Sequence, residues 1–188
     1  MINLFNQNIL NVHDKDKTPV TKYSGLSKIY FKKIIIKIVD LIKKKNPKKV
    51  LDFGCGIKKL SKHLCTDTSI ECLNFDIKKE LSEIDSYKNY DFDFFVANHV
   101  VALMEEYEFI ELLEYLKSKN VNLKLIFGIG TQSLLAKFLA VLSFNFKSHN
   151  GTKISFKRQL EILKEYFDIL EVYDIFFITK IYYCRFKN

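Results

Sequence analysis

The 188-residue chain has no tryptophan, two prolines and six glycines, and its only arginines are Arg158 and Arg185. So few prolines and glycines exclude a collagen-like or proline-rich chain. The four cysteines, at positions 55, 65, 72 and 184, form no Cys-x-x-Cys pair and have no histidine at zinc-ligand spacing. We therefore expect neither a disulfide scaffold nor a metal site, and we expect a reducing, cytoplasmic compartment.

Arginine is also scarce relative to lysine, since 28 of the 30 basic residues are lysines and the net charge is +8. Nucleic-acid sites favour arginine, whose planar group makes bidentate contacts. The richness in lysine, isoleucine, asparagine and phenylalanine resembles a bias toward A/T-rich codons. We interpret the lysines mainly as a solvated surface, with a nucleic acid as the less favoured partner. The most apolar helix-like stretch, 133–144, is too short to span a bilayer.

Hydrophobic residues make up 48% of the chain, enough for one domain over residues 26–188 after a polar N-terminal arm of residues 1–25. Apolar spacings of three and four predict helices, and short apolar runs predict strands. The helices are predicted at 26–45, 58–64, 105–117, 131–144 and 155–166, the last with Ser155 as N-cap, and the strands at 49–53, 69–77, 92–97, 123–127, 169–175 and 177–186. Their alternation predicts an α/β fold with a mainly parallel sheet, helices on both faces, and antiparallel closing strands.

A Gly-x-Gly turn follows the first predicted strand, in the segment 50–56 (VLDFGCG). Glycines at such a turn let the backbone approach a ligand closely, and the turn lies where open α/β sheets bind ligands. The segment resembles the first motif of class I S-adenosylmethionine-dependent methyltransferases, acidic-x-Gly-x-Gly-x-Gly. Asp52, Gly54 and Gly56 match this motif, whereas Lys58 replaces its last glycine. The resemblance implies that the glycines admit the methionine part of the cofactor and that Asp52 faces its amino group.

Later segments are similar to further parts of the same family. Asp76 ends the second predicted strand like the acidic residue that binds the ribose, and Ile77 follows it at the place of the residue that lies on adenine. The segment 92–100 resembles the fourth strand and its turn, which implies that Asn98 contacts cofactor or substrate and that His99 is the candidate proton acceptor. His149 lies in a polar segment, and in this fold such a segment can cover the substrate, so the resemblance implies that His149 contacts the substrate.

Only 15 residues separate Asp76 from Phe92, where the family fits a helix, a strand and another acidic motif. We therefore predict that the third family strand is missing or rudimentary, with Asp85 as its only remnant. A dinucleotide site is a less favoured alternative because the last glycine of its motif is Lys59 here. A plain tight turn is a further alternative, and Cys55 is interpreted as a small buried residue.

The sequence thus predicts a methyltransferase that uses S-adenosylmethionine and acts on an unidentified small-molecule acceptor. Two alternatives remain open. Lys58 and the short segment 77–91 favour a degenerate methyltransferase fold that serves as a binding or scaffold protein. The lysine-rich segment 28–49 would instead suit an enzyme directed at RNA. Nothing in the sequence predicts an oligomeric state.

Overall fold

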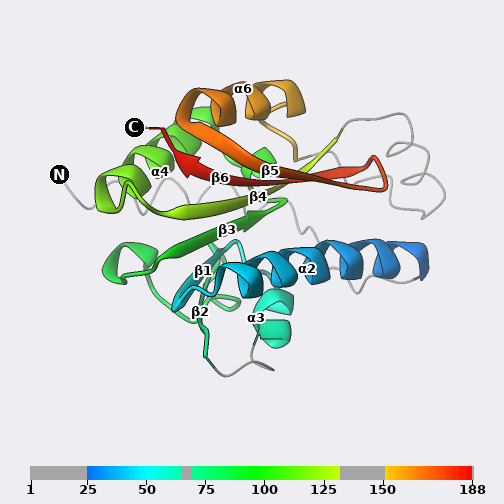
Figure 1. Cartoon of the computed structure of the whole chain (residues 1–188), viewed down its shortest axis with the longest axis horizontal. Coiled ribbons are helices and arrows are strands. Elements are labelled where there is room, and N and C mark those ends of the chain that lie inside the picture. Colours follow the sequence, from blue (N-terminus) through cyan, green and yellow to red (C-terminus); the bar gives the residue numbers. More distant parts are fainter. Residues whose placement is uncertain (1–24, 65–68, 132–150, 188) are drawn as a thin grey trace.

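The computed structural model describes residues 25–64, 69–131 and 151–187, which form one six-stranded sheet with helices on both faces (Figure 1). The elements in chain order are α2 (Gly25–Lys45), β1 (Lys49–Phe53), α3 (Lys59–Leu64), β2 (Glu71–Phe75), η1 (Tyr87–Asn89), β3 (Phe94–Asn98), η2 (Val101–Leu103), α4 (Glu106–Lys119), β4 (Lys124–Gly130), α6 (Phe156–Tyr166), β5 (Phe167–Ile175) and β6 (Thr179–Phe186). The predicted N-terminal arm, the predicted helix 131–144 beyond residue 131, and His149 lie outside the described residues.

The sheet has the strand order β2-β1-β3-β4-β6-β5. The first four strands in this order run parallel, and β6 pairs antiparallel with both β4 and β5. The predicted Rossmann-like α/β fold with an antiparallel end is therefore confirmed. Since parallel strands end at one edge, the segments that follow Phe53, Phe75 and Asn98 meet there, which is the usual ligand edge of such sheets.

Two hydrophobic layers hold the helices against the sheet (Figure 1). Val50 and Val96 face the layer that α2 contributes to, whereas Leu51 and Phe95 face the layer that contains α4 and α6. Successive strand residues point to opposite faces, so a strand covered on both faces must be apolar throughout. This is why the strands read as short continuous apolar runs, and why a polar residue within them is informative.

The segment 76–93, between β2 and β3, contains no strand, which confirms that the third family strand is missing. In its place the chain folds back beside β2, where the Glu83 N–H donates a hydrogen bond of 2.9 Å to the Asn74 carbonyl. The Ser82 hydroxyl donates to the Ile84 carbonyl at 2.7 Å and braces the fold-back. A short segment thus covers the edge of β2 without forming a ladder.

The strand predicted at 123–127 continues further than expected, because β4 extends through Gly128, Ile129 and Gly130. The prediction ended the strand at glycines, which weaken strands on their own. Here β6 pairs with this part, with Gly128 opposite Ile181 and Gly130 opposite Thr179. The glycines leave room for neighbours: a Cβ on Gly128 would lie 2.2 Å from the Asn98 Oδ1 atom. Tertiary pairing therefore overrides the local glycine signal.

In the part of the chain described, no helix is both long and apolar enough to cross a membrane.

Candidate active site

The turn between β1 and α3 is anchored to the end of β2. The N–H groups of Gly54 and Cys55 both donate to the Phe75 carbonyl, at 2.8 and 3.0 Å. Gly54 has a φ of 75° and is packed so closely that a Cβ would lie 2.2 Å from the Val100 Cγ2 atom. Both its conformation and its packing therefore require glycine. The turn joins the ends of β1 and β2 to the segment after β3.

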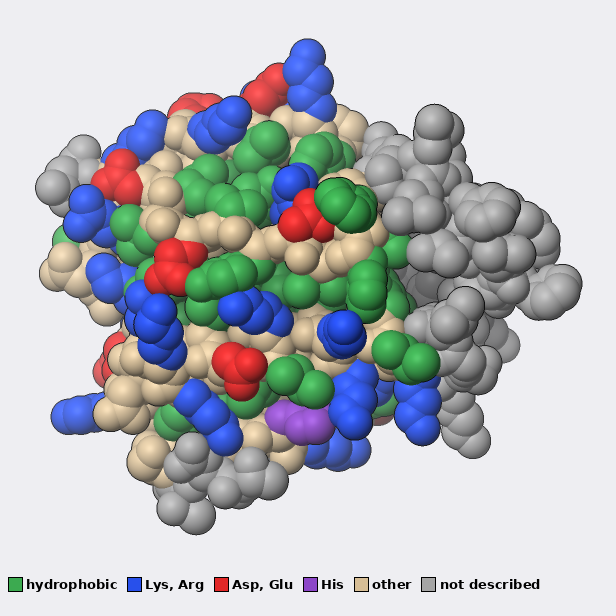
Figure 2. Space-filling model, turned by 45° about the vertical axis from the view of Figure 1, so that its right-hand side comes forward, with side chains coloured by type: hydrophobic (Ala, Val, Ile, Leu, Met, Phe, Trp, Pro, Cys, Tyr) green, Lys and Arg blue, Asp and Glu red, His purple; other side chains and the backbone are tan. Residues whose placement is uncertain are grey.

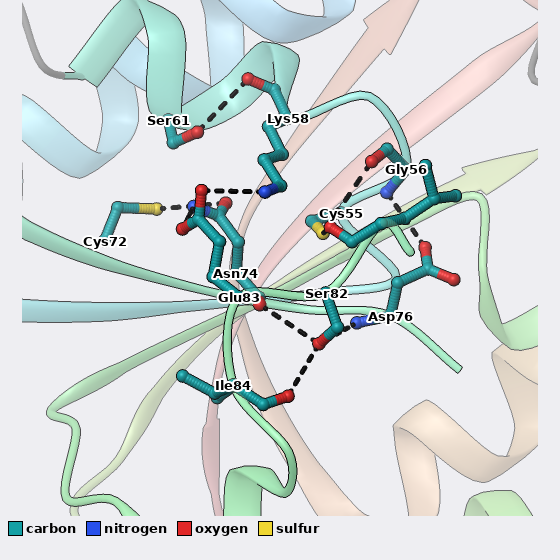
Figure 3. Close-up of polar contacts among 11 residues, drawn as sticks. Cys55, Gly56, Lys58, Ser61, Cys72, Asn74, Asp76, Ser82, Glu83 and Ile84 are labelled. Atoms are coloured by element: carbon teal, nitrogen blue, oxygen red, sulfur yellow. Dashed lines mark hydrogen bonds and ion pairs between the residues drawn. The ribbon is translucent and has the colours of Figure 1, made fainter. Parts of the chain in front are cut away.

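Gly56 is the second glycine of the turn, and it differs from Gly54 in its surroundings. Its φ is 51°, yet a Cβ placed on it would meet nothing within 4 Å. Its N–H donates to the Asp76 Oδ2 atom at 2.9 Å, and the other carboxylate oxygen accepts from the Lys78 N–H at 3.0 Å (Figure 3). The structure thus brings together Gly56 and Asp76, 20 residues apart, beside open space.

Asp52 is a carboxylic acid buried inside the sheet, with 5% of its surface exposed. Burial, and secondarily the charge of Asp76, raise the pKa of Asp52 from 3.8 to about 7. Within the described residues no group donates a hydrogen bond to its carboxylate. A buried acid left in this state is costly unless a cation or donor arrives from outside the chain. Asp52 therefore marks the place where a positively charged ligand group would be stabilised.

Lys58, which departs from the family motif, turns its side chain toward β2. Its ammonium lies 2.8 Å from the Glu83 Oε1 atom, and the other oxygen of that carboxylate accepts from the Asn74 amide at 2.6 Å (Figure 3). This ion pair lowers the pKa of Glu83, with the Lys58 contact as the largest cause. Figure 3 shows the Lys58 side chain on the Glu83 side, while Asp76 contacts Gly56 from another direction. Lys58 is thus directed to Glu83 and not to the Asp76 carboxylate.

Lys58 nevertheless has a φ of 57°, a conformation that favours glycine. We expect Lys58→Gly to leave cofactor affinity within a few-fold, because the side chain points to Glu83. The free energy of unfolding should rise by up to about 1 kcal/mol, since relief of the left-handed backbone outweighs a half-exposed ion pair. Urea unfolding and calorimetric titration measure the two quantities. A gain in affinity of about 100-fold would show instead that Lys58 obstructs the site.

Asn98 ends β3 on the sheet face that α2 covers, the same face as Asp52. Its Oδ1 atom is buried and has no hydrogen-bond partner among the described residues. Gly128 leaves the space for this oxygen. Ile77, the residue predicted to lie on adenine, is 44% exposed directly after Asp76. The predicted residues of the first, second and fourth family motifs thus all lie at the carboxyl edge of the sheet.

His99 follows Asn98 with a φ of 60°, and its N–H donates to the Gly128 carbonyl at 2.8 Å. Its Nε2 atom lies 3.0 Å from the hydroxyl of Thr179, which also shares a short hydrogen bond with the Tyr30 hydroxyl. The ring is further held by Phe31, with ring centroids 5.8 Å apart. His99 is therefore fixed in orientation by residues from α2 and β6.

Thr179 and Tyr30 were not predicted as site residues. Thr179 is fully buried at the start of β6, and Tyr30 appears in the sequence only as one apolar position of α2. They are separated from each other by 149 residues, and Thr179 is 80 residues from His99. No local pattern could have found this chain of hydrogen bonds, because it depends on α2 and β6 meeting at the same edge.

Cys55, which lies within the motif, is buried, and burial raises the pKa of its thiol to about 12. Its Sγ atom contacts the Leu81 carbonyl at 3.6 Å. A thiol with this pKa is protonated at neutral pH and is not a nucleophile. The structure therefore supports its interpretation as a small packing residue.

No family model and no curated protein matches the sequence. Solved structures do match the fold. Magnesium protoporphyrin IX methyltransferase (ChlM) from Synechocystis PCC 6803, with bound S-adenosylhomocysteine, is 14% identical, with a TM-score of 0.60 over 89% of this chain and 90% of that chain. Human N-acetylserotonin methyltransferase, in complex with S-adenosylmethionine, is 12% identical, with a TM-score of 0.58 over 82% and 52%.

The small RNA methyltransferase HEN1 also matches, at 14% identity and a TM-score of 0.63, over 89% of this chain and 26% of that chain. At these identities the likeness establishes the fold alone. That fold is the one of class I S-adenosylmethionine-dependent methyltransferases, as the motif at 50–56 predicted. The similar proteins act on different acceptors, so the fold does not identify the acceptor of this chain.

Proposed function

We propose that this protein is a methyltransferase that uses S-adenosylmethionine. The observation that carries the proposal is the buried carboxylate of Asp52, which has no described donor and lies beside a glycine turn with open space at Gly56. The methionine part of this cofactor ends in an ammonium group, which would satisfy Asp52. The chemistry of the residues present therefore fits S-adenosylmethionine, which one solved structure of this fold contains, while another contains S-adenosylhomocysteine.

Six residues of the chain would contact the cofactor in this proposal. Asp52 would face the ammonium group, Gly54 and Gly56 would admit the methionine part, and Asp76 would accept hydrogen bonds from the ribose. Each Asp76 oxygen accepts one hydrogen bond from a backbone N–H and so keeps capacity for a second donor. Ile77 and Asn98 would contact the adenine and the neighbouring part of the site. When bound, the cofactor supplies an electrophilic methyl group on a sulfonium.

We propose that His99 accepts the proton that the substrate group loses when it receives the methyl group. If its Nε2–H donates to Thr179, the lone pair of the neutral ring lies on Nδ1, which would then act as the base. Thr179 and Tyr30 would then act as positioning residues that select this tautomer and hold the ring. His149 remains a proposed substrate contact, outside the described residues.

The scaffold alternative rested on Lys58 and on the missing third strand. The orientation of Lys58 toward Glu83 supports an accessible cofactor site, because the lysine is neutralised there by an ion pair. The missing strand affects only the sheet edge beside β2. Gly54, Gly56 and Asp76 keep their positions without it. Cofactor binding is the property that separates the enzyme from a scaffold that has lost it.

We expect Asp76→Asn to weaken S-adenosylmethionine binding by about 5- to 100-fold, as the loss of hydrogen bonds to a charged group predicts. Isothermal titration calorimetry with S-adenosylmethionine and S-adenosylhomocysteine measures this effect. The matched control is Asp93→Asn, since Asp93 also accepts from two backbone N–H groups, those of Lys48 and Lys49, at the opposite edge. Equal affinity of the two folded variants would contradict the assignment of Asp76, and a wild type that binds neither compound would overturn the proposed function.

A further inference from the structure

The basic residues are unevenly distributed over the helices. The sequence of α2 contains seven lysines and one acidic residue, Asp40, and α3 contains two lysines, one histidine and no acid. On the other face of the sheet, α4 contains four glutamates and two lysines. A codon bias would enrich lysine in every helix alike. A codon bias therefore does not explain why the lysines concentrate on α2 and α3, and their position in the fold has to be considered.

The first half of α2 lies at the same edge of the sheet as His99, because Tyr30 reaches Thr179 there. Lys28, Lys32 and Lys33 belong to this half. Within the described residues none of these three lysines forms an ion pair with a carboxylate. Lys28 is also close enough to Lys59, at the start of α3, to lower the pKa of Lys59 after burial has lowered it. Three lysines at this end of α2, none of them in an ion pair with a carboxylate of the described residues, favour an anionic partner.

Aromatic side chains adjoin Lys33. Phe176 and Phe177 form the turn between β5 and β6 and are 44% and 73% exposed. Lys33 lies over the ring of Phe176 at 4.8 Å, and the rings of Tyr30 and Phe176 are 6.5 Å apart. On the face drawn in Figure 2, basic side chains (blue) lie among hydrophobic ones (green). The surface therefore places cations next to flat apolar groups.

The backbone conformation of this turn is unusual for phenylalanine. Phe176 and Phe177 have φ values of 55° and 58°. Bulky residues rarely adopt this region, whereas glycine and asparagine do so readily. The tight turn between β5 and β6 accounts for these φ values. The exposure of both phenylalanine side chains places apolar ring surface where a ligand can contact it.

We propose that a single-stranded nucleic acid binds along the surface formed by Lys28, Lys32, Lys33, Phe176 and Phe177, and that it is the methyl acceptor. This inference rests on the proposed function and names its substrate class. Phosphates would contact the lysines, and bases would stack on the rings, as in proteins that bind single strands. A strand lying there would reach the edge where His99 is held. The methyl acceptor would then be a polyanion and not the small molecule expected from the sequence.

The first test measures binding of a fluorescein-labelled, unstructured RNA of about 16 nucleotides by fluorescence anisotropy at several salt concentrations. The wild type should bind with a steep salt dependence. The triple variant Lys28→Gln, Lys32→Gln, Lys33→Gln should reduce the slope of log affinity against log salt by about 2, since each phosphate contact to a single strand contributes about 0.7. The matched control replaces Lys43 and Lys44, at the other end of α2, together with Lys48, just before β1, and should leave the slope nearly unchanged.

The second test replaces both phenylalanines with asparagine, which suits their backbone conformation and should preserve the fold. Phe176→Asn with Phe177→Asn should weaken RNA binding about tenfold or more. The salt slope should stay as in the wild type, because no charge is removed. Circular dichroism and urea unfolding confirm that the variant is folded. Unchanged RNA affinity in this folded variant would contradict stacking on the two rings.

Three other outcomes would overturn the proposal. These are the absence of salt-dependent RNA binding by the wild type, an equal effect of the two lysine triples, and stronger binding to vesicles of phosphatidylcholine and phosphatidylserine than to RNA. The last outcome would indicate a membrane surface. The titration with S-adenosylmethionine is independent of all three. If the protein binds the cofactor but not RNA, only the nucleic-acid inference is contradicted. If it binds RNA but not the cofactor, the proposed methyltransferase function is contradicted.

Discussion

Gly54→Ala is expected to destabilise the protein by about 2–5 kcal/mol. A Cβ at this position would lie 2.2 Å from one Val100 methyl and 3.0 Å from the other, and the φ of 75° is unfavourable for alanine. The left-handed conformation costs about 1–2 kcal/mol, and overpacking adds about 1–3 kcal/mol. This is a large fraction of the about 5–15 kcal/mol that stabilises a typical domain. Urea unfolding followed by circular dichroism measures the loss.

Gly56→Ala is the matched variant for this prediction, since it shares the positive φ but has no atom within 4 Å of the added Cβ. Only the conformational cost of about 1–2 kcal/mol should remain, so this variant should fold. Its Cβ would project into the space assigned to the cofactor, and S-adenosylmethionine affinity should fall. Adding Val100→Ala to Gly54→Ala should recover part of the lost stability. If the two glycine variants were equally stable, the packing of Gly54 against Val100 would be wrong.

Asp52→Asn is expected to stabilise the ligand-free protein at about pH 8 while weakening its affinity for S-adenosylmethionine. The pKa of Asp52 is raised from 3.8 in the unfolded chain to about 7 in the folded protein. Between these two pH values the folded protein therefore retains a proton that the unfolded chain has lost. Stability is therefore highest below the unfolded pKa and falls as pH rises from about 4 to about 7. Each pKa unit corresponds to about 1.4 kcal/mol. Allowing for burial of the new amide, we expect a gain of about 2 kcal/mol at high pH.

The pH dependence of unfolding isolates this effect from that of other titrating groups. Thermal unfolding of wild type and Asp52→Asn should differ little at low pH and diverge as pH rises from about 4 to about 7. Whereas Asp52→Asn should raise stability at high pH, it should lower the affinity for the cofactor. The ammonium group of the cofactor favours the ionised carboxylate, and asparagine cannot supply that charge. Parallel stability curves for the two proteins would show that Asp52 has an ordinary pKa. Unchanged affinity in the variant would remove Asp52 from the proposed site.

The parts of the fold that depend on neighbouring residues could be predicted from the sequence. The apolar run 49–53, the helical spacing within 26–45 and the Ser155 cap of α6 are short-range patterns, and the structure confirms all three. The short connection after Asp76 was enough to predict the missing strand, because a helix and a strand cannot fit within it. The motif at 50–56 likewise indicated the fold, because a glycine turn after a buried strand is a local feature.

Contacts between distant segments decided the rest. The sequence could place Lys58 at a motif glycine but could not show that its ammonium binds Glu83, which only the fold-back beside β2 brings within 2.8 Å. It named His99 but not Thr179, because their hydrogen bond requires β6 to pair with β4 next to the end of β3. It counted the lysines but could not place Lys33 beside Phe176, 143 residues further along the chain. Composition and local periodicity determine which elements form, whereas side-chain direction and partnership follow from how those elements pack.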